Sequence, residues 1–113
     1  MIPILIIDDD PVIRDGLVKL FTARAIDAKT VPDAETAVAV LKEQEFDLVL
    51  TDYHLPGRDG LSVIEYAKSL SKERPVVMIA AQGDMDVVVK ALRLGVDDFI
   101  SKPFKPVELV SIV

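Results

Sequence analysis

Short, continuous hydrophobic runs recur along the chain and alternate with segments in which hydrophobic residues have helical spacing. The runs are rich in β-branched side chains and stop at charged or turn-forming residues, as do strands that are buried on both faces of a sheet. They predict strands at residues 4–7, 27–31, 46–51, 76–80 and 99–101.

A helix is predicted after each of these strands. Asp10 offers a side-chain acceptor for the start of the first helix, and Pro11 suits its first turn. Gly95 is predicted to end the fourth helix in a left-handed conformation. The other helices are expected to start near Pro32-Asp33, after the turn-rich loop 53–60, at Gln82-Gly83-Asp84 and at Pro106. The residues expected on their apolar faces include Leu17 and Phe21 in the first helix, Ala34, Ala37, Val38 and Leu41 in the second, and Met85, Val88, Ala91 and Leu92 in the fourth.

The alternation of five strands with five helices predicts a single α/β domain. Right-handed crossovers then give a doubly wound, five-stranded parallel sheet with helices on both faces. A chain of 113 residues has room for one such core, so we expect one domain over residues 1–113. The last helix is expected to be cut short, with an effector domain beyond it. Functional groups should lie at the carboxyl ends of the strands.

Composition narrows the classes of function. The chain has 13 Lys and Arg against 19 Asp and Glu, a net charge of −6, which argues against direct contact with nucleic acid. It has no cysteine, which excludes disulfides, thiolate metal sites and cysteine nucleophiles. No apolar run approaches the roughly 20 residues of a membrane helix, so we expect a cytoplasmic domain with no membrane contact.

Charged residues follow three of the predicted strands. Asp8 and Asp9 come after the first strand, Asp52 after the third and Lys102 after the fifth. Carboxylates that converge at one sheet edge repel each other unless a cation or protons intervene. Hard oxygen ligands favour Mg²⁺, with Mn²⁺ or Ca²⁺ as substitutes. Lys102 adds a positive charge suited to a phosphoryl oxygen.

The chain resembles the receiver domains of two-component response regulators, which have the CheY-like fold. The resemblance covers nearly the whole chain, and it implies a strand order of 2-1-3-4-5. The segments that carry it are ILIIDDDPVIR at 4–14, DLVLTDYHLPGRDGL at 47–61, PVVMIAAQGD at 75–84, GVDDFI at 95–100 and SKPF at 101–104.

The resemblance assigns a phosphoacceptor role to Asp52. By analogy it takes a phosphoryl group from a sensor histidine kinase or a phosphotransfer protein, so the domain is not an enzyme beyond its own phosphorylation and dephosphorylation. Lys102 would contact the phosphoryl oxygens, and Lys102-Pro103 would form a cis peptide bond.

The resemblance also implies a set of metal ligands. Asp9 and Asp52 would coordinate Mg²⁺ directly, and Asp8 would act mostly through water. The main-chain carbonyl of His54 would be a further ligand. His54 and Gln82 would occupy the loop positions that tune the hydrolysis of the acyl phosphate.

Ala80 departs from the family pattern. Receiver domains usually have Ser or Thr there, whose hydroxyl binds the phosphoryl group during activation. Without this hydroxyl, we expect that Asp52 can still be phosphorylated. We expect the coupling of phosphorylation to conformational change to be weaker. A pseudo-receiver, a protein-interaction module with impaired switching, is the alternative interpretation. Phe99 stands where many relatives have the tyrosine of the switch.

The resemblance further implies an output face. It comprises the helix at 84–94, the strand at 98–101 and the helix after Pro106, and it would serve a homodimer or an effector domain. Val87 and Val89, beside Met85, are expected to leave apolar surface there. The segment at 81–104 most resembles receivers that control transcriptional effectors.

Overall fold

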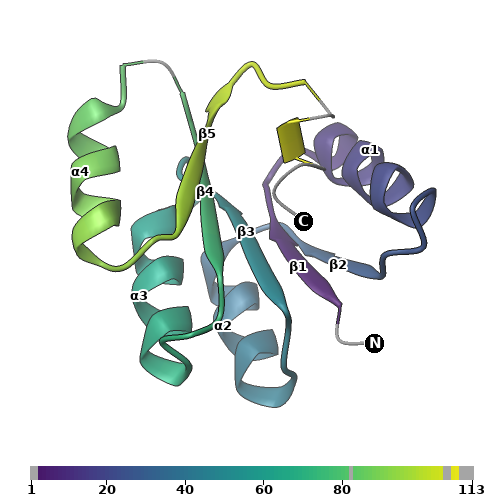
Figure 1. Ribbon diagram of the computed structural model, residues 1–113, viewed down its shortest axis with the longest axis horizontal. Helices are drawn as coiled ribbons and strands as arrows, with labels where there is room; N and C mark the ends of the chain where they lie inside the picture. The colour runs from purple at the N-terminus through teal and green to yellow at the C-terminus, as the bar shows by residue number, and fades with distance from the viewer. Residues whose placement is uncertain (1–2, 82, 106–107, 110–113) are drawn as a thin grey trace.

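Five parallel strands form one sheet, in the order β2-β1-β3-β4-β5 (Figure 1). The computed structural model describes residues 3–81, 83–105 and 108–109. The predicted fold class and strand order are confirmed, while the predicted fifth helix falls mostly outside the described residues. The strands are β1 (Ile4–Ile7), β2 (Ala28–Val31), β3 (Leu48–Asp52), β4 (Val76–Ala81) and β5 (Asp98–Lys102). The helices with described bounds are α1 (Pro11–Thr22), α2 (Ala34–Glu43), α3 (Gly60–Leu70) and α4 (Met85–Arg93).

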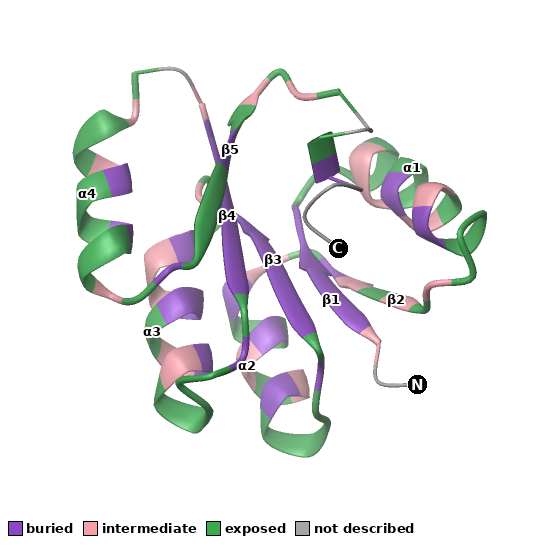
Figure 2. Ribbon diagram, viewed as in Figure 1, coloured by how far each residue is buried: buried purple, intermediate pink, exposed green. Residues whose placement is uncertain are grey.

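Alternate residues of each strand face opposite sides of the sheet, and each side has its own core. Leu5, Val49 and Met78 pack toward α2, α3 and α4. Ile6 and Leu50 belong to the other core, which includes residues of α1. β1, β3 and β4 are consequently buried along most of their length (Figure 2), as their continuous hydrophobic runs predict, whereas the edge strands β2 and β5 are largely outside the core.

Aspartates begin three of the helices. The side chains of Asp10, Asp33 and Asp59 each accept a hydrogen bond from a backbone N–H in the first turn. Gly95 follows the end of α4 with a φ of 97°, as predicted for a residue in the left-handed region. No helix in the described part of the chain has the length and hydropathy needed to cross a membrane.

The buried face of α4 differs from the prediction. Val88 and Ala91 are buried, but Met85 and Leu92 are 66% and 56% exposed. Val87, expected at the surface, is half-buried and packs against the core. The reason is that α4 lies beside the edge strand β5 (Figure 1), so only a narrow stripe of the helix reaches the sheet. Its apolar residues cover a wider arc than this stripe.

The ion pair between Lys68 and Asp97 ties α3 to the ends of the sheet opposite the predicted site. Lys68 Nζ lies 2.7 Å from Asp97 Oδ2, which also accepts a hydrogen bond from Val76 N. Partial burial opposes the charged form of Asp97, but the bonds from Lys68 and Val76 outweigh it and lower the pKa of this carboxyl below 3.8.

Asp97 should therefore stabilise the fold at neutral pH and lose this contribution in acid. A lowered pKa stabilises the protein above the unfolded pKa, and the gain disappears as pH falls through the folded pKa. Because Asp97 is 47% exposed, we expect Asp97→Asn to cost about 1 kcal/mol at pH 7. Urea unfolding should show this difference shrinking below about pH 4. The exposed Glu73→Gln should cost little at pH 7, and an equal loss there would contradict the prediction.

Candidate functional site

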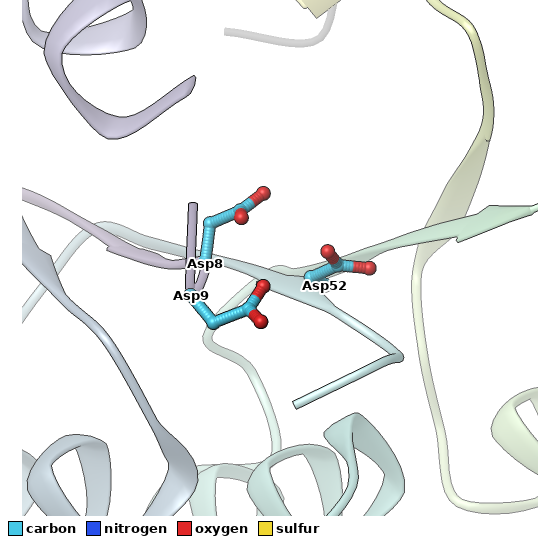
Figure 3. Close-up of side chains that lie close together, drawn as sticks. All are labelled: Asp8, Asp9 and Asp52. Carbon is cyan, nitrogen blue, oxygen red and sulfur yellow. The ribbon is translucent and has the colours of Figure 1, made fainter. Parts of the chain in front are cut away.

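Three carboxylates meet at the carboxyl ends of β1 and β3. Asp52 ends β3, and Asp8 and Asp9 follow β1, which is the parallel neighbour of β3. Each residue offers one oxygen, and these oxygens all lie within 4.8 Å of one another. Figure 3 shows the three side chains directed toward a common space. Asp8 and Asp52 are each 1% exposed, whereas Asp9 is open to solvent.

The cluster fits a divalent cation. Asp8 Oδ1 accepts a hydrogen bond from Asp10 N at 2.9 Å, but Asp8 Oδ2 is buried without a hydrogen-bond partner. Burial raises the pKa of Asp8, and the negative charge of nearby Asp52 raises it further. An additional positive charge nearby would stabilise the ionised form of Asp8 against both burial and the charge of Asp52. Carboxylate oxygens are the donors that Mg²⁺ prefers, so Asp8, Asp9 and Asp52 could hold it.

Lys102 brings a positive charge to the same place from the end of β5. Its Nζ lies 2.6 Å from Asp52 Oδ2 and 3.8 Å from Asp8 Oδ2. Burial works against the charged form, but the hydrogen bond with Asp52 and the surrounding carboxylates raise the pKa of Lys102 above 10.5. Lys102 is thus a protonated ammonium group at physiological pH. Its peptide bond with Pro103 is cis, the geometry that the family resemblance implies.

His54 lies beside the cluster, at the start of the loop that follows β3. Its backbone N donates a hydrogen bond to Asp52 Oδ1 at 3.3 Å. Its ring points elsewhere, with Nε2 lying 3.1 Å from Asp84 Oδ2. The second expected loop residue, Gln82, lies outside the described residues.

A small cavity adjoins Ala80, which is 2% exposed in β4. Ala80 pairs in register with Ser101 on β5, and Phe99 is 38% exposed on the same strand. These three residues and the first turn of α4 line a cavity of about 220 Å³. Ala80, whose side chain has no hydroxyl, therefore has open space beside it.

Two contacts at the site were not foreseen from the sequence. Arg14 Nη1 donates a hydrogen bond to the Asp8 carbonyl at 2.7 Å, and Asp84 reaches His54 across two loops. The helical spacing after Asp10 places Arg14 one turn into α1, close to the acidic turn, and this signal could have identified it. No local pattern links His54 with Asp84, because their contact depends on the shape of both loops.

Asp8→Asn is expected to stabilise the metal-free protein and to weaken its binding of Mg²⁺. The substitution removes a buried negative charge that faces two other carboxylates, and the Asn side-chain N–H groups can donate to a carboxylate oxygen, which the partnerless Asp8 Oδ2 cannot. In EDTA, the free energy of unfolding should rise by about 1 kcal/mol. Urea unfolding with and without Mg²⁺ measures both effects. A variant that is less stable in EDTA, yet gains as much from Mg²⁺ as the parent, would contradict the prediction.

The sequence matches a known family over nearly its whole length. The family described as the response regulator receiver domain matches residues 4–113. The DNA-binding response regulator MtrA of Mycolicibacterium smegmatis is 38% identical over 108 residues, which cover 96% of this chain and 47% of the relative. The phosphate regulon transcriptional regulatory protein PhoB of Escherichia coli is 36% identical over 110 residues, covering 96% and 48%. The chain spans about half the length of these curated relatives.

Solved structures give the same result. The receiver domain of NtrX from Brucella abortus has a TM-score of 0.88 at 36% identity, over 96% of this chain and 92% of that one. A CheY-like response regulator receiver domain protein from Methanospirillum hungatei has a TM-score of 0.94 at 27% identity, over 99% and 90%. Sequence and backbone therefore agree on the same group of proteins.

Proposed function

Because the chain belongs to the family of response regulator receiver domains, we propose that Asp52 accepts a phosphoryl group from a histidine kinase or a phosphotransfer protein. The observation that carries the proposal is the surroundings of the Asp52 carboxylate. A protonated lysine lies 2.6 Å from one of its oxygens, and two further carboxylates share its space. This combination of a buried acceptor, a cation and potential metal ligands suits phosphoryl transfer.

In the proposed step, an oxygen of Asp52 attacks phosphorus while the bond from phosphorus to the donor nitrogen breaks. The donor histidine keeps the electron pair of that bond, and the product is an acyl phosphate. Lys102 donates a hydrogen bond to Asp52 Oδ2. In the proposed step it exchanges this hydrogen bond for one to a phosphoryl oxygen. Asp9, Asp52 and the His54 carbonyl would hold Mg²⁺ directly and Asp8 would hold it mostly through water, and the ion would supply positive charge for the phosphoryl oxygens. No general base is needed, because Asp52 is a carboxylate.

The proposal extends to an output face on α4 and β5. Met85, Val89 and Leu92 expose apolar side chains on α4, and Phe99 does so on β5. Such a surface suits a homodimer or an effector domain. Since the names of two relatives describe a DNA-binding regulator and a transcriptional regulatory protein, we propose transcription as the output. The net charge of −6 fits a domain that makes no nucleic-acid contact itself, and we place it in the cytoplasm.

Phosphorylation can be tested by intact-mass spectrometry. The protein is incubated with acetyl phosphate and Mg²⁺, and in parallel with acetyl phosphate and EDTA. We expect a gain of one phosphoryl group with Mg²⁺ and little gain in EDTA. No gain, with Mg²⁺ binding shown separately by its effect on unfolding, would refute the phosphoacceptor role. That result would favour the pseudo-receiver, to which the missing hydroxyl at Ala80 already points.

Ala80→Thr is expected to strengthen the response of the output face to phosphorylation. The cavity of about 220 Å³ beside Ala80 offers space for the larger side chain. A hydroxyl that binds a charged phosphoryl oxygen contributes about 1.5–3 kcal/mol, or roughly tenfold or more in the equilibrium between the two states. Hydrogen exchange of α4, compared at equal phosphorylated fractions, measures the change. An unaltered response would show that Ala80 does not limit the switch.

A further inference from the structure

Asp84 occupies the position before α4 but does not cap it. The three other aspartates in this position, Asp10, Asp33 and Asp59, each bind a backbone N–H of their own helix. Asp84 makes no such bond. Its Oδ2 instead accepts a hydrogen bond from Ala81 N at 2.9 Å and lies 3.1 Å from His54 Nε2. Since an ionised carboxylate only accepts hydrogen bonds, the His54 ring is the donor.

A continuous set of contacts therefore joins the phosphoacceptor to the start of α4. The backbone N of His54 binds Asp52 Oδ1 at 3.3 Å, and the ring of the same residue binds Asp84. Asp84 is directly followed by Met85, the first residue of α4. A displacement of the loop at Asp52 thus reaches α4 through two hydrogen bonds and the side chains of His54 and Asp84.

The packing around the first turn of α4 leaves this turn room to move. Asp84, Met85 and Val88 line the cavity of about 220 Å³, together with Ala80 and Phe99. Met85 is 66% exposed, so the first residue of the helix has little packing against the sheet. Segments with sparse buried contacts respond most readily to a small bias.

We propose that the hydrogen bond between His54 and Asp84 transmits the state of Asp52 to α4. The link makes Asp84 a positioning residue for the response, and it does not use a hydroxyl at position 80. The proposal rests on the phosphoacceptor role of Asp52. It adds a route by which this chain, with Ala80, moves its output helix.

Hydrogen exchange of α4 tests the link in the parent, His54→Ala, Asp84→Ala and the double variant. Each protein is measured alone, with Mg²⁺, and with Mg²⁺ and acetyl phosphate, and intact mass gives the phosphorylated fraction of each sample. We expect phosphorylation to change the exchange of parent α4 amides by at least about fivefold. Either single variant should lose most of this change, and the double variant should lose no more.

Asp86→Ala is the matched control, because Asp86 is an exposed acid in the first turn of the same helix. It should keep the parent response. If Asp84 served only to start the helix, Asp84→Ala would alter exchange equally with and without phosphate, and His54→Ala would respond like the parent. That pattern would overturn the proposed link. The proposal would also be overturned if phosphorylation of the parent left the hydrogen exchange of α4 unchanged.

A sample with no mass gain would refute the phosphoacceptor role separately. The samples measured with Mg²⁺ alone would still test the link between His54 and Asp84, since an ion at Asp52 also perturbs the His54 loop. A response of α4 to Mg²⁺ that both single variants lose would support the link. A response that His54→Ala keeps, or no response in the parent, would overturn it.

Discussion

Replacing Asp52 with asparagine is expected to abolish the mass gain that acetyl phosphate and Mg²⁺ produce. The amide is not a nucleophilic carboxylate, and the other acids of the cluster lack the short contact with Lys102 that Asp52 has at 2.6 Å. The variant should remain folded, because it removes a buried negative charge from a cluster of three carboxylates. Its free energy of unfolding in EDTA should equal or exceed that of the parent.

Asp47→Asn is the matched control for this variant. Asp47 is an exposed acid next to the other end of β3, so the loss of its charge should leave the mass gain intact. Proteolysis followed by peptide mass analysis should place the phosphoryl group of the parent on Asp52. A gain that persists in Asp52→Asn would assign the acceptor to another residue, and mapping would then distinguish Asp8 from Asp9.

Gly60→Ala is expected to cost about 2–3 kcal/mol of stability, the upper range for overpacking a well-filled site. A Cβ at this position would overlap the carbonyl oxygen of Asp52 and lie 2.8 Å from the Cα of Tyr53. Both atoms belong to the backbone, so neither can turn away as a flexible side chain would. The first turn of α3 must shift, and it would move the end of β3, with Asp52, as well.

Gly16→Ala is the same substitution at an open position and should have the opposite effect on stability. Gly16 lies within α1, and nothing approaches the position of its Cβ within 4 Å. Alanine in an exposed helical position should stabilise the protein by about 0.5–1 kcal/mol. Urea unfolding of both variants gives the comparison. If Gly60→Ala were as stable as the parent, the close packing of α3 on the end of β3 would be wrong.

The sheet was predictable because its strands have hydrophobic residues on both faces. β1 begins and ends as predicted, and β4 and β5 differ only at their ends. β3 starts at Leu48 rather than at residue 46, because Phe46 is buried but belongs to the connection before the strand. The meeting of Asp8, Asp9 and Asp52 was also predictable, since parallel strands bring their carboxyl ends to one edge.

Features that depend on the exact placement of a helix or a loop were not predictable. The hydrophobic pattern of α4 does not reveal that Met85 and Leu92 face solvent, because it carries no information on how far the helix overlaps the sheet. Likewise, Asp84 has the same local sequence setting as an ordinary helix cap. Its carboxylate instead accepts a hydrogen bond from Ala81 N and contacts His54, which lies thirty residues earlier in the chain.

The two-sided core also separates stability from signalling. Asp52 and Lys102 have the same strand parity as Leu50 and Ile100, which pack on the side of α1, whereas α4 covers the opposite side. The sheet therefore lies between α4 and the side of Asp52 and Lys102, and the proposed link through His54 and Asp84 runs around the sheet edge through the loops. Substitutions within the sheet should change how firmly the domain folds, while loop substitutions can adjust sensitivity and duration.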